Sequence, residues 1–104
     1  MNQEMEMICF QLISNSGGAK SSYIEAIQLA KQGNFDEAEQ KLEEAREFFN
    51  NAHHIHTQLI QKEASGEGVG FSLLFMHAED QMASTEMAQL LAQEFIELYK
   101  KQEI

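Results

Sequence analysis

The chain has 104 residues, with 17 acidic against 7 basic side chains and a formal net charge of −10. This excess of negative charge argues against nucleic acid or an anionic membrane as a partner. Proline is absent, and Ala, Leu, Met, Glu, Gln and Lys are abundant, which is an all-α composition. The one cysteine, Cys9, cannot form an internal disulfide, and no apolar run approaches the ~20 residues of a membrane span. We therefore expect a single cytoplasmic domain over residues 1–104, without membrane insertion.

The first expected helix is defined by apolar residues at helical spacing. They are Met5, Ile8, Leu12, Ala19, Tyr23, Ile27 and Ala30. Cys9 falls in this apolar run and is therefore expected to be a core thiol rather than a nucleophile. The spacing continues through residues 14–18, which include Gly17 and Gly18. Because each glycine weakens a helix by about 1 kcal/mol, we expect one helix with a soft or kinked point there.

The second expected helix follows a turn that carries both a stop signal and a start signal. Gly33 suits the position after a helix, and Asn34 followed by Glu37 indicates an N-cap with a reciprocal capping partner. The buried face should comprise Ala38, Leu42, Ala45, Phe48, Ala52, Ile55 and Leu59. Residues 65–70 carry three alternating glycines without the Gly-Lys-Ser/Thr ending of a phosphate-binding loop, so they predict a flexible turn.

The third expected helix runs from near Phe71 to about Lys101. Short connections make neighbouring helices antiparallel, so the predicted fold is an all-α, antiparallel up-down-up three-helix bundle. This last helix is apolar most of the way round, with Phe75, Met82 and Leu90 roughly opposite the side that carries His77. The other two helices of the bundle cannot cover all sides of such a helix. We therefore expect self-association through that opposite side.

Polar side chains interrupt one apolar side of the third helix. His77, Asp80, Gln81 and Ser84 share that side with Leu73, Leu74, Leu91, Phe95 and Leu98. An imidazole and a carboxylate one turn apart among leucines form a site where burial and a charge partner can both set a pKa. The alternative is a structural histidine that is hydrogen-bonded to a neighbour.

A second group of histidines, His53, His54 and His56, lies on the second helix. None of the three pairs with another at the i, i+4 spacing that helical zinc sites use. His56 borders the apolar stripe, whereas His53 and His54 should point mostly outward. We therefore predict no metal role for this group.

The segment from His77 to Met82 resembles the IIA component of the lactose/cellobiose class of the bacterial phosphoenolpyruvate-dependent sugar phosphotransferase system. The resemblance runs nearly end to end and includes residues 52–54, 61–66 and 94–99. It implies that His77 accepts a phosphoryl group from the phosphohistidine of the carrier HPr. It also implies that His77 passes this group to a cysteine of the matching IIB protein, for uptake of a β-linked disaccharide.

The resemblance further implies a homotrimer, with Asp80 at its centre binding a divalent ion, usually taken as Mg²⁺. The chain departs from the family at two positions: Glu79 stands where Gln is common, and Gln81 stands where His is common. Gln81 lies on the His77 side and is a candidate supporting residue, whereas Glu79 should point away from His77.

Two other functions fit a helical bundle that carries a histidine. One is a histidine phosphotransfer domain of a two-component pathway, whose local motif matches poorly. The other is a non-catalytic helical adaptor, in which His77 has no chemical role. The sugar itself cannot be deduced from the sequence.

Overall fold

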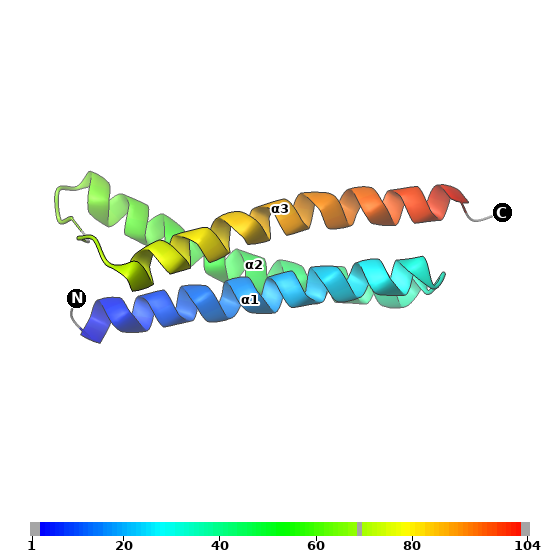
Figure 1. Ribbon diagram of the computed structural model, residues 1–104, viewed down its shortest axis with the longest axis horizontal. Coiled ribbons are helices and arrows are strands. Elements are labelled where there is room, and N and C mark those ends of the chain that lie inside the picture. Colours follow the sequence, from blue (N-terminus) through cyan, green and yellow to red (C-terminus); the bar gives the residue numbers. More distant parts are fainter. Residues whose placement is uncertain (1–2, 69, 103–104) are drawn as a thin grey trace.

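The computed structural model describes residues 3–68 and 70–102, which form three α-helices. They are α1 (Gln3–Lys31), α2 (Phe35–Ala64) and α3 (Leu73–Gln102). Figure 1 shows α1 and α3 running in the same direction, with α2 antiparallel to both. The bundle measures 55 × 21 × 19 Å, so its long axis is somewhat longer than one 30-residue helix, which spans about 45 Å. The predicted up-down-up bundle is confirmed.

Helix α1 is the central element, because it packs along both α2 and α3 while those two touch each other only slightly. The core at the end near the α1–α2 turn consists of Ala19, Tyr23, Ala26, Ala30, Ala38, Leu42, Ala45, Ala92 and Ile96. The core at the other end consists of Met5, Cys9, Leu12, Ala52, Leu59, Ala78 and Met82. Many of these residues are alanines, so the helices approach closely and leave large side chains outside.

The turn between α1 and α2 is built around Gly33, which has φ +84°. Its N–H donates to the carbonyl of Ala30, and the N–H of Asn34 donates to the carbonyl of Leu29. These two bonds form the Schellman motif that follows a helix when glycine takes the left-handed conformation. The predicted stop signal is therefore confirmed.

The predicted capping role of Asn34 is wrong. Its side chain makes no capping bond and instead donates from Nδ2 to Oε1 of Gln32. The backbone conformation of Asn34 explains this. Its ψ is 68° rather than the extended value typical of an N-cap, and its N–H already donates to the Leu29 carbonyl at the end of α1. Only the carbonyl of Asn34 serves α2, by accepting from the N–H of Ala38.

Helix α1 continues without a break through residues 14–18. The two glycines in that stretch have different roles. A Cβ atom on Gly18 would lie 2.9 Å from Cδ1 and Cε1 of Phe48, whereas one on Gly17 would meet nothing within 4 Å. Gly18 therefore lets the Phe48 ring of α2 rest directly on the α1 backbone.

We expect Gly18→Ala to destabilise the protein by about 1–3 kcal/mol, because the added methyl group collides with a large, packed ring. Gly17→Ala is the matched control and should stabilise the helix by about 0.5–1 kcal/mol. Thermal unfolding at equal protein concentration compares the two variants. A Gly18→Ala protein as stable as the Gly17→Ala protein would contradict this packing.

Helix α3 begins at Leu73, two residues after the predicted start at Phe71. Ser72 caps it: the Ser72 hydroxyl accepts from the N–H of Phe75 at 3.0 Å, and the Ser72 carbonyl accepts from the N–H of Met76. In the preceding turn, Gly66 and Gly70 have positive φ, as flexible glycine turns require. Val69, also part of the predicted turn, lies outside the described residues.

The inward face of α3 differs from the expected one. Ala78, Met82 and Thr85 are buried in the chain's own core, and Met82 is only 1% exposed. Met82 was expected to face another copy, but its sulfur accepts a hydrogen bond from the Ser16 hydroxyl of α1. The side that carries His77 is therefore the outward one. None of the helices in residues 3–68 and 70–102 is long and apolar enough to cross a membrane.

Candidate functional site

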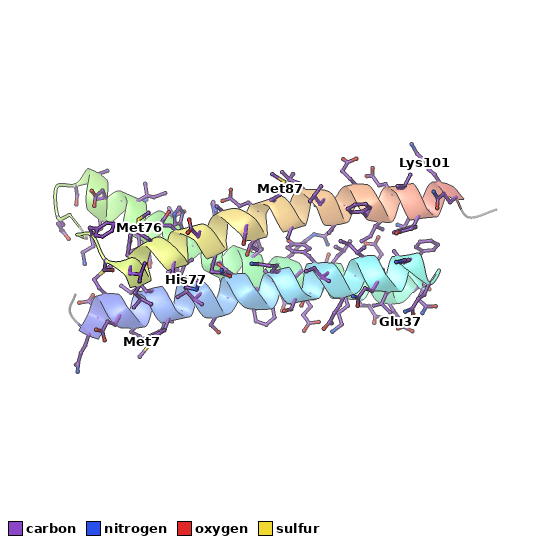
Figure 2. All side chains as sticks on the ribbon, in the orientation of Figure 1. Met7, Glu37, Met76, His77, Met87 and Lys101 are labelled. Carbon is purple, nitrogen blue, oxygen red and sulfur yellow. The ribbon has the colours of Figure 1, made fainter. Side chains whose placement is uncertain are left out.

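His77 lies in the second turn of α3, and its side chain is exposed. Figure 2 places it in the half of the bundle that contains Met7 and Met76, far from Lys101. Within residues 3–68 and 70–102, its imidazole makes no hydrogen bond. Both ring nitrogens are therefore open to a reacting group or to a partner protein.

Asp80 and Ser84 are exposed on the same face of α3 as His77. The apolar side chains around them are exposed too, with Leu73 83% and Leu91 46% accessible. The expected burial of the imidazole and carboxylate is therefore wrong for a single chain. The opposite face of α3 packs into the bundle through residues such as Ala78, Met82 and Thr85, so Leu73, Leu91 and Leu98 stay exposed on this face.

Gln81 lies at the edge of this face and contacts α1. Lys20 of α1 donates from Nζ to Oε1 of Gln81 at 3.2 Å, and both side chains are half-buried. The next turn is tied to α1 as well, because the buried Thr85 hydroxyl lies 3.0 Å from the Ser16 carbonyl and 2.8 Å from the Gln81 carbonyl. Sequence reasoning identified Gln81 but missed Lys20, which is 61 residues away along the chain.

Glu79 points away from His77, as predicted, and meets α2. Its carboxylate lies 2.9 Å from Nε2 of His56, and both side chains are partly buried. This pair bridges two helices that otherwise touch little. Sequence patterns could not predict this pair, because the contact depends on the register between α2 and α3.

The other two histidines of the α2 group lie outside this site. His53 and His54 are exposed, as predicted; His53 stacks on Phe49 at 6.3 Å between ring centroids, and His54 contacts Gln58. No group of three His, Cys, Asp or Glu side chains suited to a metal ion occurs within the described part of one chain. The predicted Asp80 site takes one carboxylate from each of three chains, so this finding does not test it.

Cys9 is fully buried in the core near the N-terminal end. Burial raises the pKa of its thiol, and the charge of Glu79 raises it further. A neutral, inaccessible thiol is a poor nucleophile. The prediction of a core thiol is confirmed.

An open apolar groove of about 750 Å³ lies between the end of α2 and the start of α3, and His77 is not among its lining residues. Its lining residues are Leu59, Ile60, Glu63, Ala64, Gly70, Phe71, Phe75, Met76 and Glu79. Phe71 is 84% exposed and Met76 is 42% exposed. This end of the bundle therefore offers apolar surface that suits protein contacts, on a different side of α3 from His77.

The fold and site thus consist of an exposed histidine on an elongated three-helix bundle, and comparison with known families specifies the class of protein. The model of the family "PTS system, Lactose/Cellobiose specific IIA subunit" matches residues 7–100. The chain belongs to this family and is a IIA component of a sugar phosphotransferase system. Components of this kind transfer phosphoryl groups through a phosphohistidine.

Relatives of known structure or function agree over nearly the whole chain. The lichenan-specific phosphotransferase enzyme IIA component of Bacillus subtilis is 46% identical, over 97% of this chain and 92% of its own length. The cellobiose-specific enzyme IIA of Bacillus anthracis is 48% identical with a TM-score of 0.94, covering 99% of this chain and 94% of that one. The IIA(Chitobiose) of Escherichia coli, solved in complex with HPr, is 34% identical with a TM-score of 0.83, covering 99% and 100%.

Proposed function

We propose that His77 accepts a phosphoryl group from the phosphohistidine of HPr and passes it to a cysteine of a IIB component. The observation that best supports this proposal is the exposed His77 imidazole, which shares its face of α3 with exposed apolar side chains. The chain's membership of the IIA family supports it as well. The relative solved in complex with HPr supports HPr as the donor. Such a relay takes place in the cytoplasm.

The chemistry requires a neutral imidazole nitrogen, for which we propose Nε2, as the nucleophile. Its lone pair attacks phosphorus, the new N–P bond forms, and the N–P bond to the HPr histidine breaks. In the second step a IIB thiolate attacks, forming an S–P bond and releasing the His77 imidazole. Phosphoryl transfer depends mainly on alignment and charge stabilisation, so an exposed nucleophile with few neighbouring groups is sufficient.

We further propose that the exposed face of α3 joins three copies of the chain. Up to Leu91 its members recur every three or four residues, as in coiled-coil seams, and Leu98 follows seven residues later: Leu73, His77, Asp80, Ser84, Met87, Leu91 and Leu98. Viewed down the axis of α3 at 3.6 residues per turn, Asp80 lies about 20° to one side of Leu91. His77 lies about 40° to the other side of Leu91. This arrangement puts Asp80 closer to the axis and leaves His77 at the edge, where a partner protein can reach it.

Three Asp80 carboxylates near one axis supply hard oxygen ligands, which suit Mg²⁺. The ion would hold the three α3 helices together by neutralising their like charges. We assign it this structural role and route no step of the phosphoryl transfer through it.

The proposed cargo is a β-linked disaccharide of the cellobiose type. The name of the Bacillus anthracis relative refers to cellobiose, and that of the Escherichia coli relative refers to N,N'-diacetylchitobiose. Both sugars are β-linked disaccharides. Because the IIA component does not bind sugar in the proposed relay, this class rests on the names of these relatives and not on the site of His77.

The test of the relay is to incubate the protein with phosphoenolpyruvate, Enzyme I and HPr. We expect acid-labile phosphate on His77, located by mass spectrometry, and its loss when a IIB protein is added. Labelling from a phosphorylated response regulator instead would favour a two-component phosphotransfer domain. A protein that accepts no phosphate from either source would be an adaptor.

Substituting glutamine for His53, His54 or His56, one at a time, should leave the rate of phosphoryl acceptance within about twofold of the wild type. His53 and His54 are exposed away from His77, and His56 contacts Glu79 rather than the reacting face. The same labelling reaction, followed over time, provides the measurement. A folded His54→Gln protein that accepts no phosphate would show that the α2 histidines take part in the transfer.

A further inference from the structure

The contact between Lys20 and Gln81 determines which end of the Gln81 amide faces α1. The Lys20 ammonium group carries hydrogen-bond donors only, so it can bond the amide oxygen but not the amide nitrogen. Accordingly, Nζ of Lys20 lies 3.2 Å from Oε1 of Gln81. The Nε2 group of Gln81, with its two N–H donors, is therefore directed away from Lys20.

These two N–H donors lie on the side of α3 that carries His77. Gln81 follows His77 by one turn, so the Cβ atoms of the two residues are about 5–6 Å apart. In the described ranges 3–68 and 70–102, Nε2 has no hydrogen-bond partner. The backbone beneath it is held firmly, since the Gln81 carbonyl accepts bonds from both Ser84 and Thr85.

We propose that Lys20 is a positioning residue for phosphoryl transfer: it holds the Gln81 amide so that Nε2 donates a hydrogen bond to the phosphoryl group on His77. This inference rests on the proposed function of His77. Without Lys20 the amide can turn over and present Oε1, an acceptor, to the phosphoryl oxygens. A donor that is already oriented stabilises the transferring group without reorganising during the reaction.

The chain offers few other ways to balance the charge of a phosphoryl group. It carries 7 Lys and Arg residues against a net charge of −10. Lys41 forms ion pairs with Glu25 and Glu44, and Lys100 with Glu39, whereas within residues 3–68 and 70–102 Lys20 bonds to the neutral Gln81. Lys20 thus brings an uncompensated positive charge to the edge of the His77 face.

The experiment measures phosphorylation of the full-length protein by phospho-HPr as a function of HPr concentration. We expect Lys20→Met to lower the maximal rate about tenfold, as the loss of one oriented hydrogen bond should, while the HPr concentration at half-maximal rate stays the same. Gln81→Met should have the same effect. The double variant should be no slower than either single one, because both act through one donor.

Lys20→Arg, which also carries only donors, should retain most of the wild-type rate. Lys100→Met, which removes a cation at the far end of the bundle, is the matched control and should be unchanged. A normal rate for Gln81→Met would overturn the inference, and so would a Lys20→Met protein that needs more HPr but reaches the wild-type maximum. If wild-type protein carries no phosphate on His77, the proposed function fails; if it does and Lys20→Met is fully active, only this inference fails.

Discussion

Replacing His77 with alanine should abolish phosphoryl acceptance and leave a folded, helical protein. The proposed nucleophile is lost, so no N–P bond can form at this site. The fold should survive because the His77 side chain is exposed and alanine is the best helix former. Labelling by phosphoenolpyruvate, Enzyme I and HPr measures the first result, and circular dichroism with thermal unfolding measures the second.

His77→Gln provides a stricter version of the same test, because glutamine keeps a polar side chain of similar size without a nucleophilic nitrogen. It should be as inactive as His77→Ala. The matched control is His54→Gln, an exposed histidine on α2 that should remain active. Acid-labile phosphate retained in the His77→Ala protein would move the acceptor elsewhere, with His54 examined first.

Mg²⁺ should raise the melting temperature of the wild-type protein by several degrees and leave Asp80→Asn unaffected. Three carboxylates on one axis repel each other, and a divalent cation that binds only the assembled state stabilises it by about 2.7 kcal/mol at a hundred times its dissociation constant. Three amides do not repel and bind the ion poorly. Thermal scans with Mg²⁺ and with a chelator, on both proteins, give the comparison.

Assembly itself should persist in Asp80→Asn, because most of the exposed face of α3 is apolar. Leu73, Met87, Leu91 and Leu98 are each between 46% and 83% exposed in the single chain, and burying them supplies the association free energy. Sedimentation of both proteins with and without chelator should give trimers throughout. A monomeric wild type would contradict the proposed seam, whereas a wild-type trimer insensitive to chelator would contradict only the metal.

The three helices and their order followed from local patterns in the sequence. Apolar residues at helical spacing predicted each helix, and Gly33 predicted the end of the first, because both signals depend on neighbours within one or two turns. The same holds for His77, Asp80 and Gln81, which share one side of α3 through their spacing alone. The N-cap predicted at Asn34 was the exception. Its backbone N–H is part of the turn after α1, and its side chain makes no capping bond to α2.

Only the tertiary structure decided which face of α3 turns inward. Both of its faces carry enough apolar residues to be buried, so periodicity within the helix could not choose between them. The choice is made by fit against α1, where Ser16 meets both Met82 and Thr85. This packing leaves His77 exposed rather than buried.

By itself, the sequence determined the helical bundle and the grouping of His77, Asp80 and Gln81 on one side of α3, because both are encoded in spacing along single helices. The partners of that site depended on the register between helices. Lys20 reaches Gln81 across 61 residues of chain, and His56 reaches Glu79 across 23. That register depends on how closely small residues let the helices approach each other. Gly18, for example, lets the Phe48 ring pack against the backbone of α1. Such packing between helix surfaces exists only once the chain has folded.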